Sequence, residues 1–465
     1  MINFLSTELN DELILISSLH GRWKVLEKKE FEKIKKNEIN SSLIKELTEK
    51  GLILTEKNKI RILNEFSSKN DFILNHTSSF IFGTTNRCSH NCIYCCSMST
   101  NEKNDETDMD FKVAKKIIDF SFNSPSRKII FEFQGGEPLL NFKLIKEASK
   151  YIKNKNKKLG KKIIFNIATN LEYMDEDKLD FLVNNKFNIG TSLDGPEFIH
   201  NKNRKLNSNN WNKNYEKVRY WMSFAKKKYN YEINPTLVIT SKSLNHHKDI
   251  IDEYVKNEFS SIHIKPMIYC GRAYENWEEV GYTPKEFFNF WKKSIDYIYK
   301  INKKGKLFFD TRTLIIILKI LGKEKKFMCL KKPCGAFFTQ LSFDNKGNIY
   351  PCDSARSETS LIIGNVFKDS YKNLREKYFK VFLKDLLPNN IECQNCAFLP
   401  FCHSCYTSNK MMLKKNSDSN EKNNFYCELN KLTLKYIFSN LHSNREFRWL
   451  ISSWIKKLKI GNFNG

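Results

Sequence analysis

Three cysteines with C-x3-C-x2-C spacing are the residues of this chain most suited to chemistry. Cys88, Cys92 and Cys95 follow directly after the short apolar stretch 79–83. Because thiolate is the usual ligand of iron–sulfur clusters, such a loop can bind three irons of a [4Fe–4S] cube and leave the fourth open. An open iron can bind a substrate or cofactor, as the open position of a catalytic zinc does. A zinc knuckle that also uses Cys96, or a set of buried free thiols, is the alternative that the spacing leaves.

Most of the other cysteines lie in the C-terminal third. The chain has thirteen cysteines. Zinc sites commonly take four ligands from two short pairs, so two zinc sites are one interpretation of this region. Iron–sulfur clusters are the other. The cysteines in question are Cys329, Cys334, Cys352, Cys393, Cys396, Cys402, Cys405 and Cys427.

Composition indicates a folded protein of several domains. The chain has 465 residues, which predicts about two to four domains. Its formal charge is +26, but the lysines are scattered along the chain and mixed with asparagines. We therefore predict that it does not bind nucleic acid. An acidic peptide partner is compatible with the charge.

The sequence predicts a cytoplasmic protein without a membrane span. No stretch reaches the roughly 18 consecutive apolar residues that a span needs, and the longest candidate, 314–318, is interrupted by Lys319. The N-terminus carries acidic residues and lacks a basic-then-apolar signal segment. In the cytoplasm, cysteines favour metal or redox chemistry over structural disulfides.

From residue 76 the pattern becomes strand, loop and helix, repeated. Such alternation predicts an α/β fold of parallel βα units, with helices at, for example, 111–120 and 143–153. Active residues should gather where the carboxyl ends of the strands meet. The predicted strands are 80–84, 129–133, 162–168, 188–193, 232–240 and 261–266.

Polar motifs follow several of these strands. Gly135 and Gly136 allow backbone to approach a ligand closely, and the Glu137 carboxylate beside them can accept from an ammonium group. Taken alone, this is also an ordinary glycine-rich turn. Thr169 and Asn170 follow the next strand, where a simple helix cap is the competing interpretation.

The cysteine loop resembles the signature of the radical S-adenosylmethionine (SAM) enzymes, including the aromatic residue before its last cysteine. In that family the open iron chelates SAM, and an electron from the cluster cleaves SAM to methionine and a 5′-deoxyadenosyl radical that abstracts hydrogen from the substrate. The resemblance implies that Cys88, Cys92 and Cys95 hold the cluster and that Tyr94 lies near the adenine. It also implies a partial (β/α)6 TIM-type barrel over residues 76–310.

The resemblance extends to the loops that would hold SAM. In the family a GGEP motif holds the amino group of SAM, polar residues after later strands face the cofactor, and an arginine pairs with its carboxylate. The stretch 192–204 is similar to that of the anaerobic sulfatase-maturing enzymes, with Asp194 and His200 predicted to be hydrogen bonders that stabilise the loop. The implied SAM-binding residues are Gly135, Gly136, Glu137, Thr169, Asn170, Ser192 and Arg204.

The late cysteines resemble a SPASM domain, predicted here at 311–437, which binds two auxiliary [4Fe–4S] clusters. One departure is that two residues separate Cys402 from Cys405 where the family has three, which makes Cys405 the ligand most in need of a test. By position, the first auxiliary cluster takes Cys329, Cys334, Cys352 and Cys405. The second takes Cys393, Cys396, Cys402 and Cys427.

Asp353, directly after Cys352, matches an aspartate that is the general base of the sulfatase-maturing enzymes. A carboxylate near a cluster can accept the proton of the substrate. A turn carboxylate bonded to backbone is the alternative. The segments 131–141 (FEFQGGEPLLN) and 352–356 (CDSAR) are similar to the maturases of His-Xaa-Ser peptide systems.

The two ends of the chain are predicted to be separate units. Within 1–75 we expect strands at 13–16, 23–26 and 52–54 and helices at 28–36 and 41–50. This order resembles the winged-helix modules that bind leader peptides, and a packing appendage is the alternative. The tail 438–465 is amphipathic and basic, and we expect it to pack on its own domain rather than on a membrane surface.

The whole pattern predicts a radical SAM/SPASM maturase that abstracts hydrogen from a ribosomally synthesised precursor peptide, giving an oxidised or cross-linked residue. It would need SAM, one SAM-binding and two auxiliary [4Fe–4S] clusters, and a reductive electron donor such as flavodoxin or ferredoxin. Thioether, carbon–carbon and formylglycine products are all open. The alternatives are a radical SAM enzyme acting on a small molecule and a non-enzymatic zinc-binding protein.

Overall fold

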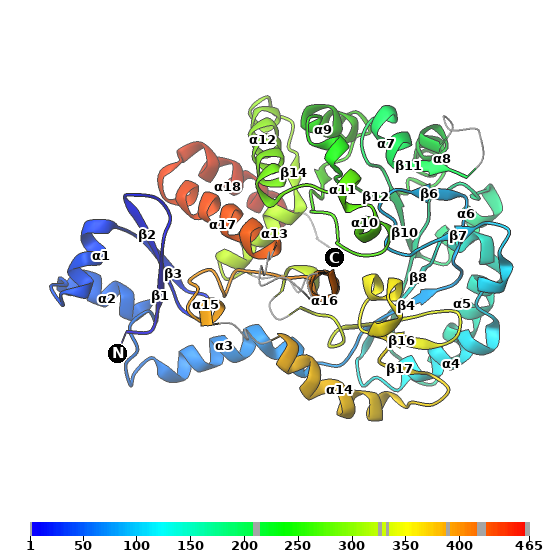
Figure 1. The fold of residues 1–465 in the computed structure, drawn as a ribbon, viewed down its shortest axis with the longest axis horizontal. Coiled ribbons are helices and arrows are strands. Elements are labelled where there is room, and N and C mark those ends of the chain that lie inside the picture. The colour runs from blue at the N-terminus through cyan, green and yellow to red at the C-terminus, as the bar shows by residue number, and fades with distance from the viewer. Residues whose placement is uncertain are drawn as a thin grey trace.

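Five parallel strands form the centre of the protein. The computed structural model describes residues 2–207, 214–323, 328–331, 334–386, 391–415 and 425–460. The parallel strands run in the order β12-β10-β9-β8-β4, so each lies beside its predecessor in the sequence, which confirms the predicted parallel βα units. The strands are β4 (Ser79–Gly83), β8 (Lys128–Gln134), β9 (Lys162–Ala168), β10 (Phe187–Ser192) and β12 (Asn234–Thr236), and the helices between them are α4 (Phe111–Phe122), α5 (Phe142–Asn156), α6 (Glu176–Asn184), α7 (Glu197–Asn203) and α8 (Asn214–Tyr229) (Figure 1).

The sixth predicted strand does not join this sheet, which stays open. β13 (Ser261–Ile262) pairs in parallel with β14 (Phe309–Asp310) instead of with β12. β12 itself is shorter than predicted, and its central residue is Pro235, which has no N–H to donate to a ladder. The parallel strands therefore curve as a partial barrel without closing.

A strand from the cysteine-rich region extends the main sheet. β15 (Gln340–Phe343) pairs in parallel with β4, and β16 (Asn348–Tyr350) and β17 (Gly364–Asn365) continue antiparallel. β15 and β16 form a hairpin, in which Asp344 Oδ1 accepts from Lys346 N and Asn348 N at 2.9 Å and Gly347 has φ +78°. This pairing brings the late cysteines next to the barrel.

Aromatic side chains pack one face of the central strands. In β8, odd-numbered residues such as Phe131 and Phe133 are fully buried, while Glu132 and Gln134 point to the other face. The rings of neighbouring strands contact one another, for example Phe165 and Phe187 at 5.0 Å between centroids. Each buried ring contributes about 1.5–3 kcal/mol to folding. The opposite face of β8 is thus left for polar residues.

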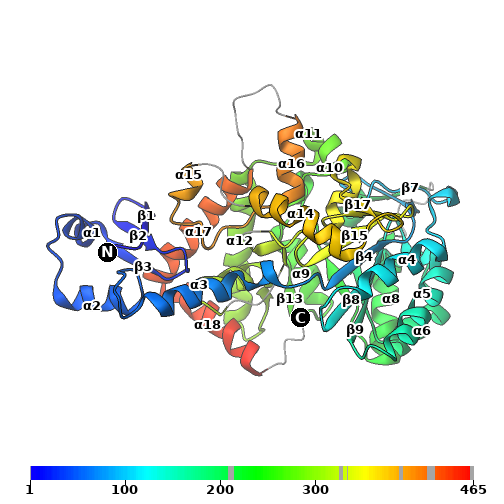
Figure 2. The same cartoon turned by 90° about the horizontal axis from the view of Figure 1, so that it is seen from below.

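The N-terminal module has its own core and lies at one end of the long axis of the molecule (Figures 1 and 2). Its predicted strands at 13–16 and 23–26 and both predicted helices are confirmed. The expected strand at 52–54 is reduced to a single bridge between Ile53 and Ile2. α3 runs from the module to β4 (Figure 2). The elements are β1 (Leu5–Glu8), β2 (Leu13–Ser17), β3 (Trp23–Glu27), α1 (Lys28–Lys35), α2 (Ser41–Glu49) and α3 (Lys59–Leu74).

The C-terminal helices join the module to the barrel. Trp23 Nε1 of β3 donates to Ile320 O at 2.8 Å, and its ring lies 5.0 Å from that of Phe438. The apolar face of the last helix is buried, including Leu450 and Trp454, so the tail packs on the protein. No helix in the described ranges is long and apolar enough to cross a membrane. These helices are α12 (Pro284–Lys303), α13 (Thr311–Ile320), α17 (Phe425–Ser443) and α18 (Arg445–Ile460).

Short elements surround the sheet and carry several motifs. β6 and β11 pair next to the first cysteine loop. The other elements are β5 (Arg87–Cys88), β6 (His90–Cys92), β7 (Thr100–Asn101), β11 (Arg204–Leu206), β13 and β14 as given above, and the helices α9 (His247–Lys256), α10 (Arg272–Glu275), α11 (Trp277–Val280), α14 (Tyr371–Leu386), α15 (Ile391–Gln394) and α16 (Tyr406–Lys415).

Candidate cofactor and active site

A cavity of about 380 Å³ opens at the carboxyl ends of the parallel strands. This is where βα loops converge in barrel folds. All residues that the sequence assigned to SAM, to the first cluster or to catalysis line it, apart from Glu137. They are Cys88, Cys92, Tyr94, Cys95, Gly135, Gly136, Thr169, Asn170, Ser192, Arg204 and Asp353.

Two of the three thiols of the first loop, those of Cys88 and Cys92, lie next to hydrogen-bond donors. Cys88 Sγ accepts from His90 N at 3.3 Å and from Asn170 Nδ2 at 3.5 Å. Cys92 Sγ lies 3.9 Å from Arg204 Nη1. Burial raises the pKa of the Cys92 thiol to about 12 and that of Cys88 well above its usual value. Buried thiols with N–H donors around them fit thiolate ligands of a cluster, whose metal would supply the missing positive charge.

Antiparallel pairing of β6 with β11 fixes the cysteine loop against the segment that follows β10 and α7. β6 pairs with β11, with Arg204 opposite Cys92. Arg272 adds a clamp from a later segment, since its Nη1 donates to Cys92 O at 3.4 Å. The loop is therefore set by contacts with two segments more than 100 residues away in sequence.

The glycine pair is required by close backbone contact with the cysteine loop. Gly136 N donates to Thr85 O at 2.7 Å, and Glu137 N donates to Arg87 O at 2.7 Å. A Cβ on Gly135 would lie 2.1 Å from Thr85 O, and one on Gly136 would lie 2.1 Å from Arg87 O. Only glycine allows this approach, so the motif and the cysteine loop are built as one unit.

Replacing Gly136 by alanine is expected to lower the thermal midpoint and the iron content after reconstitution, because the new methyl group collides with backbone that cannot move aside. Gly160→Ala is the matched control. Gly160 has φ +61° but nothing within 4 Å of the new Cβ, so only the left-handed backbone cost of about 1–2 kcal/mol is expected. Equal losses of iron in the two variants would contradict this account.

Glu137 is completely buried and does not line the cavity. Its carboxylate accepts from Thr169 Oγ1 and Asn170 N at 2.7 Å and from Leu139 N at 2.9 Å. Burial raises its pKa to about 7, and these three donors oppose that rise. Glu137 thus fixes Thr169 and Asn170 at the edge of the cavity. The contact between its carboxylate and the SAM amino group stays a prediction.

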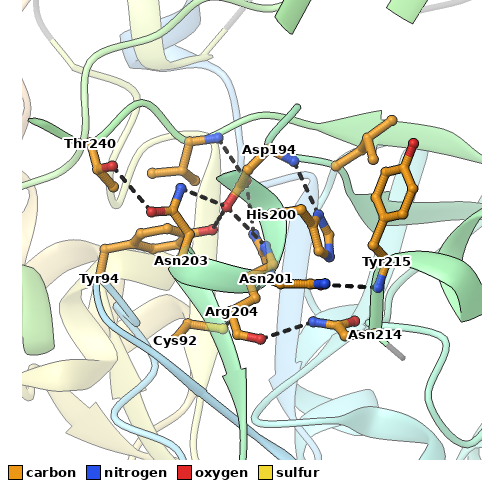
Figure 3. A network of polar contacts seen from close by, with 12 residues as sticks. Cys92, Tyr94, Asp194, His200, Asn201, Asn203, Arg204, Asn214, Tyr215 and Thr240 are labelled. Atoms are coloured by element: carbon orange, nitrogen blue, oxygen red, sulfur yellow. Dashed lines mark hydrogen bonds and ion pairs between the residues drawn. The ribbon is translucent and has the colours of Figure 1, made fainter. Parts of the chain in front are cut away.

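Asp194 is the centre of a buried polar network (Figure 3). Its carboxylate accepts from Tyr94 Oη, from Asn203 Nδ2 at 3.3 Å and from Val238 N at 3.2 Å. His200 Nδ1 accepts from Asp194 N at 3.3 Å, and burial lowers the pKa of His200 to about 4, so its ring is neutral. Asp194 and His200 have the loop-stabilising contacts that the sequence predicted for them.

Arg204 links this network to the cavity. Its Nε and Nη2 lie 3.2 and 3.5 Å from the carboxylate of Asp194, and its guanidinium lies 5.3 Å from the ring centroid of Tyr94 (Figure 3). The remaining nitrogen, Nη1, faces Cys92 Sγ. The guanidinium is thus oriented at the cavity wall by a fully buried carboxylate, and its contact with the carboxylate of SAM stays a prediction.

Asp353 lines the cavity from the cysteine-rich side. Its carboxylate pairs with Arg356 Nη2 at 2.6 Å, and the same nitrogen lies 3.5 Å from Gln134 Oε1. Glu132 and Lys265 also line the cavity and were missed by the sequence reasoning. The signal for Glu132 was present: it is an acidic residue at an alternate position of an otherwise apolar strand.

The cysteines assigned to the first auxiliary cluster are neighbours. Burial raises the pKa of Cys334 to about 12, and the charge of the nearby Cys405 is the second largest cause. The same two causes raise the pKa of Cys352. Cys329 acts on Cys334 in the same way. Tyr406 packs against the apolar cluster that contains Cys334 and Cys352.

The cysteines assigned to the second auxiliary cluster lie on α15, the following turns and α17. Asn430 of α17 donates to Cys402 Sγ at 3.4 Å and to His403 O at 2.6 Å. It stands three residues after Cys427, a spacing that puts both on one side of the helix. Sequence reasoning missed Asn430.

In the described part of the chain, no group of three or more His, Cys, Asp or Glu side chains has the geometry to bind a single metal ion.

Two family models match the chain. That of the Radical SAM superfamily matches residues 83–231, and that of the SPASM iron-sulfur cluster-binding domain matches residues 334–406. A cysteine-type anaerobic sulfatase-maturating enzyme of Clostridium novyi (strain NT) is 26% identical over 357 residues, 76% of this chain and 92% of that protein. A serine-type enzyme of Bacteroides thetaiotaomicron is 23% identical over 369 residues, 73% of this chain and 84% of that protein.

Solved structures share the fold. Native anSMEcpe with bound AdoMet and Cp18Cys peptide has a TM-score of 0.64 and 24% identity, covering 79% of this chain and 98% of that one. Streptococcus suis SuiB bound to precursor peptide SuiA has a TM-score of 0.54 and 14% identity, covering 92% of this chain and 97% of that one. These likenesses show the fold: a partial barrel joined to a cysteine-rich domain.

Proposed function

The chain is a radical SAM enzyme with a SPASM domain, its cofactors are SAM and [4Fe–4S] clusters, and we propose that it removes hydrogen from a residue of a ribosomally made precursor peptide. One observation carries the proposal: a single cavity is lined both by the cysteine loop and by Asp353 of the cysteine-rich domain. The SAM site and the SPASM domain then act on the same substrate atom. The related structures that hold peptides support a peptide substrate.

We assign the first cluster to Cys88, Cys92 and Cys95, with Asn170 and Arg204 as donors near its thiolates. When bound, SAM and this cluster supply one-electron hydrogen-abstraction chemistry. The chain itself orients the cofactor. SAM would lie against Tyr94, Gly135, Gly136, Thr169, Asn170, Ser192 and Arg204.

Asp353 is the proposed general base. Its carboxylate reaches the cavity, and Arg356 holds it in place. A base at this position accepts a proton from the substrate when the substrate is oxidised. The eight-cysteine region would hold two auxiliary clusters, whose redox chemistry suits the removal of the second electron. We include Cys405 among the ligands because it is a near neighbour of Cys334 and Cys352.

The N-terminal module is the proposed peptide-recognition unit. A groove of about 790 Å³ runs between β3, α3 and the C-terminal helices. Five cationic side chains and one carboxylate line it. The carboxylate is that of Glu65, which pairs with Arg22 at 3.0 Å. Lys24 and Lys50 also pair with Glu46, at 2.7 and 3.9 Å, and the remaining excess of positive charge suits an acidic segment of the peptide. The cationic residues are Arg22, Lys24, Lys50, Lys69 and Arg448.

Reversing charge in this groove is expected to weaken peptide binding at least tenfold at low salt, with a smaller effect at high salt because screening removes the attraction. The variant is Lys69→Glu with Arg448→Glu. The control is Lys226→Glu with Lys227→Glu, which makes the same change of net charge on the exposed side of α8. Fluorescence anisotropy with a labelled acidic peptide measures the binding. Equal weakening by both pairs would show a general charge effect and contradict recognition by the groove.

Co-expression tests the substrate class. We expect the enzyme to remove two hydrogens from a peptide encoded by a neighbouring short reading frame, detected by mass spectrometry, and the Asp353→Asn variant to lose this activity. An unmodified peptide together with turnover of a small molecule would favour the radical SAM alternative. Formylglycine as the product would assign the enzyme to sulfatase-type chemistry.

We place the reaction in the cytoplasm, with flavodoxin or ferredoxin as electron donor.

A further inference from the structure

Arg312 is a buried cation that forms no ion pair with a carboxylate in the described structure, although the charge of Asp310 acts on it. It lies on α13 with 1% of its surface exposed. Within the described residues, its Nε and Nη1 have no hydrogen-bond partner. Nη2 donates to His403 Nε2 at 3.4 Å. A buried guanidinium with two unused donors is costly unless a group outside the protein chain accepts from it.

The nearest carboxylate is fully engaged by other groups. Asp310 Oδ1 accepts from Ile264 N at 2.9 Å and from the backbone N of Arg312 at 3.3 Å. Its Oδ2 accepts from Thr313 N at 3.0 Å and from Thr313 Oγ1. This carboxylate caps α13 and makes no described contact with the guanidinium. Burial lowers the pKa of Arg312, with Asp310 only partly opposing it.

The guanidinium borders the 402–405 loop, which carries Cys402 and Cys405. His403, whose ring accepts from the guanidinium, stands between those two cysteines. Lys319, seven residues later on the same side of α13, donates to Cys402 O at 2.9 Å and to Leu330 O at 3.1 Å. Leu330 follows Cys329 directly. One helix therefore presents two buried cations to the cysteine segments.

We propose that Arg312 is the counter-charge of an auxiliary [4Fe–4S] cluster held by the 402–405 loop and raises the reduction potential of that cluster. The inference rests on the proposed placement of the auxiliary sites. A cube with four thiolates is anionic and becomes more so on reduction, and its potential depends on nearby charge and hydrogen bonds. A fixed cation with unused N–H donors stabilises the reduced form more than the oxidised one. Arg312 is thus a positioning and tuning residue, and its effect is on electron uptake.

The test compares anaerobically reconstituted full-length wild type with Arg312→Met, Arg312→Lys and Arg219→Met. Arg219 is a part-buried arginine on α8, on the far side of the barrel from α13 (Figure 1), and stacks on Tyr215. Iron and sulfide are measured first. The clusters are then reduced stepwise with dithionite, which supplies one electron per cluster, and followed by electron paramagnetic resonance.

We expect full iron loading in all variants and, for Arg312→Met, at least a tenfold lower reduced-to-oxidised ratio of one auxiliary cluster at the wild-type midpoint. For a one-electron couple this is a shift of ~59 mV to lower potential. The SAM-site signal should not move, and Arg312→Lys and Arg219→Met should match wild type. An unchanged potential in fully loaded Arg312→Met would overturn the proposal.

A loss of iron from the auxiliary sites also tests the proposal. If Arg312→Met loses auxiliary iron and Arg312→Lys keeps it at the wild-type potential, the charge is required, which supports the proposal. If both lose it equally, the shape of the guanidinium and not its charge is needed, and the proposal fails. Wild type that holds only the irons of the SAM site would instead refute the auxiliary sites themselves, so the two failures are distinguishable.

Discussion

Replacing Cys88, Cys92 and Cys95 together by alanine should lower the iron content after reconstitution from about twelve to about eight per chain and abolish SAM cleavage. These thiols line one cavity and are fixed by β6–β11 pairing, Asn170 and Arg204. Removing them leaves the C-terminal cysteines untouched. The loss should therefore be confined to a single cluster.

Cys270→Ala is the matched control for this triple variant, because Cys270 is a fully buried thiol outside the three assigned ligand sets. It should keep about twelve irons. If wild type held about eight irons and the triple variant about four, the SAM-site cluster would be supported and the protein would have one auxiliary cluster instead of two. Cys405 would then be the first ligand to test. Iron that does not change at all would contradict the assignment of this loop.

Asp194→Asn should lower the free energy of unfolding by about 3–5 kcal/mol, as expected when one partner of a buried ion pair is removed. Asp194 is completely buried, and its carboxylate neutralises Arg204, whose side chain is also buried. The amide cannot neutralise this guanidinium and turns a donor toward other donors. Tyr94 and the cysteine loop would then lose their anchor.

Urea denaturation measures the effect. Glu176→Gln is the control, since Glu176 pairs with Lys228 at 2.9 Å on the exposed surface and should change stability little. If Asp194→Asn cost no more than this control, the positive charge of Arg204 would have to be neutralised elsewhere, for example by the Cys92 thiolate. The network in Figure 3 would then not be what holds the loop.

Local patterns predicted the barrel strands well. The apolar runs at β4, β8, β9 and β10 are flanked by turn signals, and each motif was placed after a strand, where the structure has it. What the sequence could not predict are pairings between distant segments. β15 joins β4 across about 260 residues, and nothing in either strand specifies that partner.

The roles of single polar side chains also needed the structure. The contact of Glu137 with the amino group of SAM stays a prediction, and only the structure shows that its carboxylate also accepts from Thr169, Asn170 and Leu139. Asn430 donates to Cys402 Sγ from 28 residues away in the sequence, and Arg312 donates to His403 from 91 residues away. Spacing identifies ligands that share a loop, but it carries no information about donors from other elements.

Reductive cleavage of SAM tests the central claim most directly. The reconstituted protein, with dithionite and SAM, should give 5′-deoxyadenosine and methionine in equal amounts, and the Cys88/Cys92/Cys95→Ala variant should give neither. With the precursor peptide present, 5′-deoxyadenosine should form in step with loss of hydrogen from the peptide. A colourless protein that binds zinc, holds no iron and leaves SAM intact would contradict the account.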